Sequence, residues 1–438
     1  MTSLEETVEE RLTALRGDPW RTQQKFTIFR VPAFLRESSR TSYEPRLVSI
    51  GPYYRGAPAL RAMEDHKWRY LCDLLSVNIH YPVLVSASDL VAEIRSLEAQ
   101  ARACYSDPVD DLNSDEFVQM LLLDGCFILE FFFKWEREEP DTLCDVGWGL
   151  TFVLSDLLLM ENQIPFFVLQ KIYDAVVRSP REILLRLLVK HIGRMEPIGQ
   201  PSGEVNHILH LYYASFVPKW TPSQRGQTSS APRVIPSAVE MSEAGVTFAV
   251  RRDSSTDYDV VFDARRGVMY IPTIRIDDAR TPLLSNLIAF EQTQGSEEAL
   301  YLSSYVALMG QLIVTPRDVA LLRRRRVLEN MLANDEDAAR FFNHLGDCGA
   351  VNRDNHAFVE LYKDVDRYCG TWWHRNTAAL RRDYFASPWS AISFVAAAVA
   401  VALAALQTYF TIFPLNKAHI SSSEWSIKGT PTYLVSII

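Results

Sequence analysis

The stretch from Asp115 to Trp135, DEFVQMLLLDGCFILEFFFKW, decides how the interior of this protein is built. It is apolar on nearly every side of a helix, so we expect it to be buried all round. A second stretch of this kind runs from Gly149 to Val177, and Pro165 within it should kink or restart the helix. These two segments predict the central helices of a first helical core.

Helical periodicity of the apolar residues predicts further helices on both sides of these segments. Ser3 and Glu6 form a capping-box pattern that opens an amphipathic helix within residues 1–25. A last long helix from about Asn355 to Phe385 should run almost directly into an apolar C-terminal segment, with Pro388 at the join. The other expected helices cover residues 60–75, 90–104, 180–195, 283–292, 301–313, 318–332 and 335–345.

One part of the chain shows the periodicity of strands instead of helices. The segments GVTFAV, DYDVVFD and GVMYIPTIRID, between Gly245 and Asp277, place β-branched residues near period two and predict a small antiparallel sheet. Residues 218–237 are rich in Pro, Ser, Gln and Gly and predict a flexible linker or long loop. The body is therefore expected to be mainly α, with a helical core over 26–217 and a β insertion with a second helical part over 238–386.

The segment from Trp389 to Phe413, WSAISFVAAAVAVALAALQTYFTIF, has no formally charged residue. As a helix it would rise about 37 Å, enough to cross a hydrocarbon core of about 30 Å. The alternative, an apolar helix buried in a large soluble core, seldom runs so far without interruption. We therefore expect a single transmembrane helix over 389–413 with a short tail over 414–438, in a membrane that the sequence does not identify.

Two further expectations concern this segment. Ala396, Ala400 and Ala404 recur every four residues and place small side chains on one helix face, where two spans could pack closely as a homodimer or with a related chain. The N-terminus lacks the pattern of a secretory signal. Three arginines precede the span and two lysines follow it, which favours a body on the cytosolic side.

Bulk composition limits the class of protein. A chain of 438 residues with 48% hydrophobic and 23% charged residues is expected to fold into two or three packed units. The formal charge of −9 argues against a nucleic-acid binder. The cysteines show no C-x-x-C spacing, which indicates neither a zinc site nor a disulfide framework and fits a reducing compartment; they are Cys72, Cys104, Cys126, Cys144, Cys348 and Cys369.

Few residues suggest catalytic or metal chemistry. His207 and His210 have i, i+3 spacing, but no third ligand stands nearby, so a metal site is not favoured. The arginine run 323–326 could be a nuclear signal or contact lipid phosphate, although a solvated helix face is the commoner explanation. Walker loops, G-x-S-x-G and H-E-x-x-H are absent from the sequence, and we expect no cofactor.

Acidic residues within apolar helices are the remaining candidates. Asp124, Glu130, Asp156 and Glu161 could serve as general acids or bases if burial shifts their pKa values. They could equally cap backbone groups or pair with Arg and Lys, and this structural interpretation is favoured because no nucleophile pattern accompanies them.

Blocks of sequence spread over about nine-tenths of the chain resemble the plant family called domain of unknown function 247. They are Val31–Pro32 with Leu35, Tyr43 with Pro45, Val48–Tyr53 with Gly56, Met63–Leu71, Asp124–Glu130, Asp156–Leu169 with its core at Glu161–Leu169, Glu243–Val246 with Phe248, Ile271–Pro272 with Ile276–Asp278, Asn286–Gln292 and Arg382–Phe385 with Pro388–Trp389. The chain departs from the family where Tyr54 and Arg55 replace a usual pair of histidines and Ser387 replaces a common asparagine.

The resemblance implies a membrane-associated, mostly helical plant protein with no established enzymatic activity. Some grass members of the family are implicated as pollen-side determinants of self-incompatibility. We therefore expect a membrane-anchored interaction or recognition protein without catalytic activity, whose partner the sequence does not identify. The rival hypothesis is an enzyme of unrecognised chemistry, with Asp124, Glu130, Glu161 and His66 as its first candidates.

Overall fold

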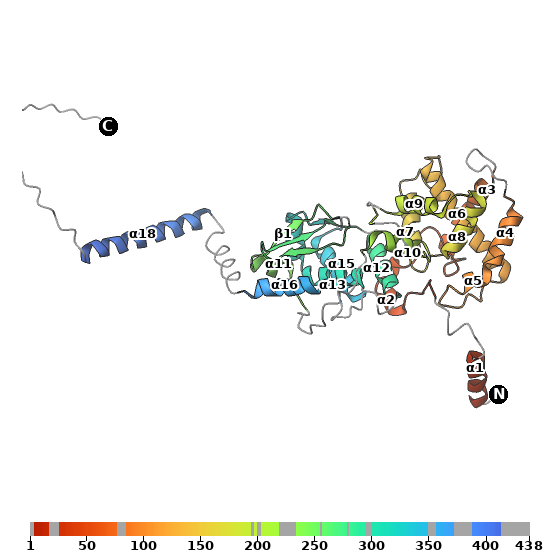
Figure 1. The fold of residues 1–438 in the computed structure, drawn as a ribbon, viewed down its shortest axis with the longest axis horizontal. Helices are drawn as coiled ribbons and strands as arrows, with labels where there is room; N and C mark the ends of the chain where they lie inside the picture. Colours follow the sequence, from red (N-terminus) through yellow and green to blue (C-terminus); the bar gives the residue numbers. More distant parts are fainter. Residues whose placement is uncertain are drawn as a thin grey trace, which may run out of the picture. The chain divides into compact units, whose positions relative to one another are not determined.

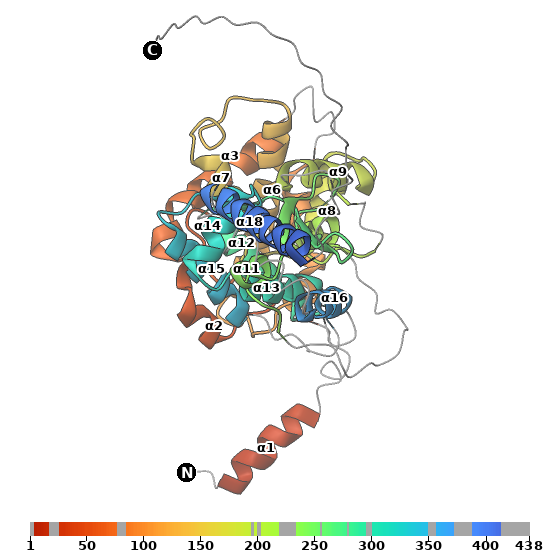
Figure 2. The same cartoon turned by 90° about the vertical axis from the view of Figure 1, so that its left-hand side faces the viewer.

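A computed structural model describes residues 4–16, 26–76, 85–193, 197–198, 203–218, 234–254, 256–277, 280–294, 300–348, 356–371 and 388–412. The chain divides into two compact units, residues 1–375 and 376–438, and each is described by itself. Figures 1 and 2 show unit 1 as an assembly of many short helices, with a few strands in its C-terminal half. The prediction of a mainly helical body is confirmed.

Helix α6 (Ser114–Glu136) is the central helix of the N-terminal half, as predicted. A capping box between Asn113 and Glu116 starts the helix, and its residues from Met120 to Phe132 are all buried. The other helices here are α1 (Leu4–Arg16), α2 (Ala33–Ser38), η1 (Arg40–Ser42), η2 (Pro58–Leu60), α3 (Ala62–Leu75), α4 (Ala87–Ser96), α5 (Glu98–Arg102), α7 (Gly149–Leu157), α8 (Phe166–Val176), α9 (Arg181–Ile192) and α10 (Ile208–Phe216). Helices α3, α4, α8 and α9 pack directly on α6.

The second predicted central segment, 149–177, forms two helices, and the predicted restart at Pro165 is confirmed. Helix α7 ends at Leu157, and α8 restarts directly after Pro165, as the fixed φ of proline favours. The irregular residues between them are buried, because the side chains of Glu161, Asn162 and Gln163 form hydrogen bonds with backbone groups of the surrounding segments. The sequence pattern did not predict that α7 ends at Leu157, since the residues that follow it are also mostly apolar.

The C-terminal half of unit 1 contains α11 (Ala238–Glu243), α12 (Arg280–Glu291), α13 (Tyr301–Leu312), α14 (Pro316–Arg324), α15 (Asp335–Cys348) and α16 (Val359–Gly370). Helix α12 lies between the two halves and contacts both α10 and α13 (Figure 1). Buried apolar residues from both halves belong to one continuous core. The predicted linker over 218–237 falls mostly on residues outside the described ranges.

The prediction of an antiparallel sheet is wrong in its detail. Strand β3 (Val268–Ile271) lies between β1 (Thr247–Val250), which is parallel to it, and β2 (Val261–Asp263), which is antiparallel. Gly267 adopts φ +64° in the turn from β2 to β3. A second pair, β4 (Ile274–Ile276) with β5 (Leu328–Asn330), is parallel. Period-two alternation predicts strands but carries no information on their direction, which depends on where the connecting chain returns.

Two predicted helices are shorter in the structure. The helix expected over 318–332 ends at Arg324, because Arg326 adopts φ +58° and the Val327 N–H bonds to the Leu322 carbonyl, after which β5 pairs with β4. The long helix expected from Asn355 to Phe385 is α16, which ends at Gly370 with an extended Thr371. The residues from there to α18 lie outside the described ranges.

In unit 2 the structure describes one helix, α18 (Pro388–Ile412), at the position of the predicted transmembrane segment. Within the described residues, however, no single helix meets the length and hydropathy expected of a membrane span. The apolar part that can be assessed, Ala396–Tyr409, is shorter than a span, and α13 with α14 passes only as a pair bent by 102°. The hydroxyls of Thr408 and Thr411 donate to carbonyls one turn earlier in α18, at 2.8 and 2.7 Å.

Candidate functional site

Buried polar side chains gather where the loop 43–56 meets the segment between α7 and α8. Glu161 is fully buried and accepts hydrogen bonds from the Val31 N–H at 2.6 Å and the Tyr54 hydroxyl at 2.8 Å. It also forms an ion pair with Arg36 of α2. Both oxygens of this carboxylate are therefore occupied by groups of the N-terminal segment.

Asp156, in the last turn of α7, holds the same loop further along. Its carboxylate accepts from the backbone N–H groups of Arg46, Leu47 and Val48 at 3.0, 2.7 and 2.9 Å. Asn162 continues this row, because its side-chain oxygen accepts from the Ile50 N–H at 2.8 Å. Burial raises the pKa of Asp156 to about 6, although the three N–H donors act in the opposite direction.

A buried ion pair between Lys67 and Asp124 holds the second half of the loop 43–56. Lys67 of α3 and Asp124 of α6 are each about 1% exposed at the side chain, and their charged atoms lie 2.7 Å apart. Asp124 also accepts from the Gly51 N–H at 2.7 Å, and Lys67 donates to the Ser49 carbonyl at 2.5 Å. Burial raises the pKa of Asp124, and the Lys67 ammonium opposes that rise.

Gly51 is required at this turn for two reasons. Its φ is +77°, a conformation that L side chains rarely adopt. A Cβ atom there would also lie only 2.3 Å from the Gln163 carbonyl oxygen. The close approach of the two segments therefore depends on this glycine.

Amide side chains join this region to the C-terminal half. Asn286 of α12 accepts from the Met160 N–H at 2.8 Å and donates to the Ser42 carbonyl at 2.7 Å. Gln163 donates to the carbonyls of Leu157 and Leu159 at 2.8 and 2.7 Å, between α7 and α8. We call this set the polar lock: Lys67, Asp124, Asp156, Glu161, Asn162, Gln163 and Asn286.

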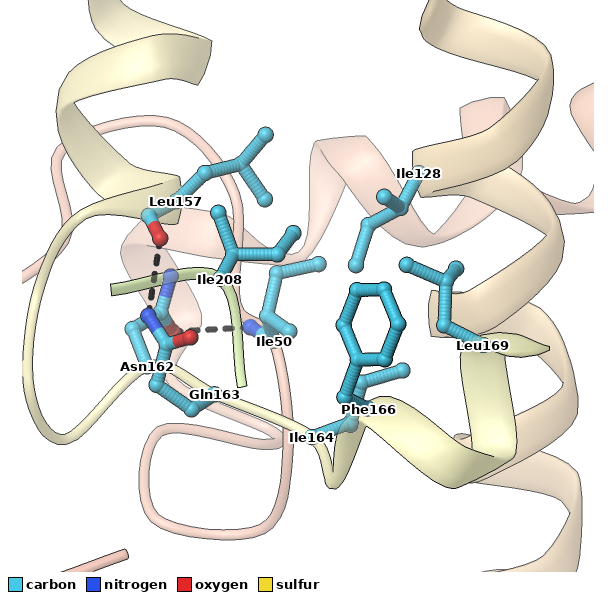
Figure 3. Close-up of a pocket in the computed structure, with 9 residues that line it drawn as sticks. All are labelled: Ile50, Ile128, Leu157, Asn162, Gln163, Ile164, Phe166, Leu169 and Ile208. Carbon is cyan, nitrogen blue, oxygen red and sulfur yellow. Dashed lines mark hydrogen bonds between the residues drawn. The ribbon is translucent and has the colours of Figure 1, made fainter. Parts of the chain in front are cut away.

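A cavity of about 10 Å³ lies beside the polar lock (Figure 3). This is room for one water molecule at most, far below the volume of pockets that hold small molecules. In Figure 3, apolar side chains surround Phe166 on one side and Asn162 and Gln163 face their backbone partners on the other. The lining residues are Ile50, Ile128, Leu157, Asn162, Gln163, Ile164, Phe166, Leu169 and Ile208.

A larger depression of about 370 Å³ lies at the surface between α4 and α8. Its charged residues have both signs, and one pair closes across it, with Lys171 Nζ 2.8 Å from a Glu93 oxygen. The other charged residues of this wall are Asp89, Asp174 and Arg178. The mixture of exposed charges gives it no preference for one class of ligand.

The catalytic candidates from the sequence are not brought together by any contact in the described part of the chain. Asp124 and Glu161 hold different backbone segments, as described above. Glu130 pairs with Arg137 at 3.1 Å near the end of α6. His66 lies partly exposed on α3.

The two candidate metal ligands have structural partners. The His207 ring caps the start of α10, accepting from the His210 N–H at 3.2 Å, and its other nitrogen lies 3.0 Å from the Thr27 carbonyl. Burial is the main cause that lowers the pKa of His207 to about 3, so the ring is neutral. His210 accepts from the Asn206 N–H at 3.1 Å. Within the described residues no group of His, Cys, Asp or Glu could hold a metal ion.

The cysteines with described side chains are free thiols. Burial raises the pKa of the Cys126 and Cys144 thiols, to about 11 for Cys144, which disfavours the reactive thiolate. Cys348 lies in α15, and its side chain is outside the described part of the structure.

Sequence reasoning missed several residues of the polar lock. Lys67, Asn162, Gln163 and Asn286 lie inside the blocks that carry the family resemblance but were not singled out as partners of the buried acids. Glu291, in the block 286–292, is a further buried acid that binds backbone groups, because it accepts from the N–H groups of Leu302 and Ser303 at 2.7 Å. The signal that could have identified these residues is that they are polar side chains within strongly apolar stretches of sequence.

Comparisons with known proteins agree with the resemblance. The model of a family described as plant protein of unknown function, DUF247, matches residues 28–403. The chain is 28% identical to UPF0481 protein At3g47200 of Arabidopsis thaliana, covering 88% of this chain and 86% of that protein. It is 25% identical to a second UPF0481 protein of the same plant, At3g02645, covering 88% and 90%. No solved structure matches this chain.

Proposed function

This chain belongs to the DUF247 family of plant proteins of unknown function, and from that premise we propose that it is a non-catalytic interaction protein anchored to a membrane. The body would present a surface to a protein partner, and α18 would hold the body at the bilayer. Recognition of self pollen, the role implied for some grass members, is the biological setting to test first.

We propose that the protein is not an enzyme mainly because the buried carboxylates are already bonded to other groups of the same chain. A general acid or base must reach a substrate proton, within about 3 Å or through one water. The oxygens of Asp156 and Glu161 are instead directed at backbone N–H, hydroxyl and guanidinium groups of the protein itself. The adjoining cavity of about 10 Å³ would not admit a substrate. These contacts support a structural role for the acids of the family blocks.

The membrane anchor is supported by the composition of the C-terminal segment. Helix α18 has 25 residues without a formal charge. Ala396–Tyr409 by itself is shorter than a span, but at about 1.5 Å per residue the 25 residues of α18 would rise about 37 Å, more than a hydrocarbon core of about 30 Å. Its side chains with assigned exposure are all exposed in unit 2, among them Val401 at 71% and Leu403 at 60%, which a lipid environment would cover.

Alkaline extraction tests the anchor directly. The full chain should remain with membranes after carbonate treatment, whereas a variant that ends before Pro388 should be released. Release of both would reject the anchor. For orientation, a tag at Met1 should be digested by protease added to sealed vesicles, and a tag at Ile438 should be protected. The reverse pattern would place the body on the other side.

Proximity labelling in native tissue tests the interaction role. A labelling enzyme fused at Met1 should mark a reproducible set of proteins that a fusion to α18 alone does not mark. If the two fusions label the same proteins, the body does not select a partner. Should Glu161→Gln fold with an unchanged melting temperature yet lose all biological activity, the enzyme hypothesis would replace this one.

A further inference from the structure

Helix α14 and the turn after it concentrate positive charge on a protein of net charge −9. Arg317, Arg324, Arg325 and Arg326 are all exposed, and in the described part of the chain no carboxylate lies within ion-pair distance of them. Arg323 is different, because it pairs with Asp335 of α15 at 2.6 Å. We call the four unpaired residues the arginine edge.

The neighbouring acids of the described chain pair with other residues or form no ion pair with the arginine edge. In α15, Asp335 is used by Arg323, while Glu336 and Asp337 lie 3.5 and 3.1 Å from Arg340. Asp318 is buried and caps α14 through Thr315. Glu329 of β5 and the two glutamates of the neighbouring helix α11, Glu240 and Glu243, are exposed, but in the described part of the chain none of them forms an ion pair with the arginine edge.

Helix stability does not account for this arrangement. Cations favour the C-terminus of a helix, where Arg324 lies, because they complement the helix dipole. Arg317, by contrast, is the second residue of α14, where a positive charge is unfavourable. Exposed arginines therefore stand at both ends of this nine-residue helix, and the helix dipole explains only those at its C-terminal end.

Apolar side chains border the arginine edge along the chain. Val314, two residues before α14, is 49% exposed, and Met331, directly after β5, is 60% exposed. Basic residues combined with exposed apolar side chains are typical of surfaces that lie at the interface of an anionic bilayer. A guanidinium group also matches phosphate with two parallel hydrogen bonds.

The arginine edge lies in the half of unit 1 from which the chain leads to α18. Contacts run from α14 through α11 and the three-stranded sheet to α16. The described part of unit 1 ends at Thr371, and α18 begins at Pro388. Residues 372–387 lie between the two in the sequence.

We propose that the arginine edge docks the body on anionic phospholipid headgroups. This inference rests on the proposed membrane anchor, which would bring the body close to a lipid surface. Each arginine near such a surface strengthens association roughly fivefold, so four could convert a loosely tethered body into one held in a fixed orientation. Docking of this kind would decide which face of the body remains open to a partner protein.

The test uses the full chain in vesicles of phosphatidylcholine, with or without phosphatidylserine. Phenylglyoxal modification followed by mass spectrometry measures the reactivity of each arginine. The arginine edge should react several-fold more slowly when phosphatidylserine is present, and high salt should restore its reactivity. Arg61, Arg69 and Arg186 are exposed residues of the N-terminal half and serve as internal controls that should not change.

Equal reactivity of the arginine edge in both lipids would overturn the proposal. So would protection by inorganic phosphate in phosphatidylcholine vesicles that matches the protection by phosphatidylserine, because the edge would then be a site for a soluble anion. In R324Q/R325Q/R326Q, the reactivity of Arg317 should no longer depend on lipid charge. The variant R61Q/R69Q/R186Q should behave as the parent chain, and equal behaviour of the two variants would also count against the arginine edge.

Carbonate extraction of the same samples separates this proposal from the anchor. If the anchor fails, protein is released from both kinds of vesicle. If only the docking fails, protein is retained and arginine reactivity is the same in both lipids.

Discussion

The polar lock and the arginine edge are both rich in charge, but they use it in opposite ways. In the polar lock, Lys67, Asp124 and Glu161 are buried, and each contacts groups of the same chain. In the arginine edge, four guanidinium groups are exposed without a carboxylate partner in the described structure. The family blocks thus coincide with charges that fix the fold. The four exposed arginines of the arginine edge lie outside these blocks.

Breaking the ion pair in the polar lock should have the largest effect. Lys67→Met leaves the Asp124 carboxylate buried without its cation, which should lower the free energy of unfolding by about 3–5 kcal/mol. Urea denaturation of the full chain in mild detergent measures the change. Arg69→Met, on an exposed side of the same helix, is the control and should change stability by less than about 0.5 kcal/mol. A similar small loss for both variants would contradict the buried-pair interpretation.

Glu161→Gln should have the next largest effect. The variant keeps one acceptor oxygen but loses the negative charge that pairs with Arg36 and accepts from the Tyr54 hydroxyl. The free energy of unfolding should therefore fall by about 1.5–3 kcal/mol. Partner binding should fall only in proportion to the folded protein. Glu136→Gln removes an exposed ion pair with Lys190 and should cost less than about 1 kcal/mol. Equal losses from the two variants would remove the distinction between buried and exposed acids.

The lowered pKa of His207 predicts how the stability of the protein changes with pH. This pKa is about 3 in the folded chain and about 6.5 when unfolded, so the unfolded state binds more protons between these values and stability falls as the pH falls. From pH 7 to pH 5 this loss should be about 2 kcal/mol. Asp156 acts in the opposite direction, because its pKa is raised to about 6 and the folded state takes up a proton first.

The contribution of His207 is therefore measured as a difference between two chains. His207→Asn keeps an acceptor for the His210 N–H and removes the titrating ring. Denaturation at pH 7 and pH 5 should show a smaller acid-induced loss for this variant than for the parent. Parallel curves for the two chains would show that His207 does not control the acid response.

The smallest effect on the stability of the body is expected from the alanine strip of α18. Replacing Ala396, Ala400 and Ala404 by leucine keeps the helix apolar but prevents close approach of two copies. The melting temperature of unit 1 should not change, whereas the yield of crosslinked dimer in membranes should fall. An unchanged dimer yield would mean that the strip has no part in self-association. The three side chains are exposed in α18, and their pairing stays a prediction.

Much of the helical framework followed from the sequence. Apolar content all round the stretch 115–135 predicted α6, and α3, α9, α12, α13 and α15 lie where the periodicity predicted helices. These predictions succeeded because the apolar residues of a buried helix face recur every three or four residues, so a short stretch of sequence is enough to indicate the helix. The structural role of the buried acids was favoured because no nucleophile pattern accompanies them, and the contacts of Asp124 and Asp156 support it.

The remaining features needed the tertiary structure, because they depend on residues far apart in the chain. Sequence alone determined that the body is mainly helical, that acids are buried in its core, and that an uncharged segment lies near the C-terminus. Only the fold decided that β1 runs parallel to β3 and that the Glu161 carboxylate accepts a hydrogen bond from the Val31 N–H. The same holds for the Asn286 side chain, which bonds to the Met160 N–H and the Ser42 carbonyl. Hydrophobic burial depends on local periodicity, whereas a hydrogen bond requires two groups within about 3 Å, and only the folded path of the chain fixes which groups meet.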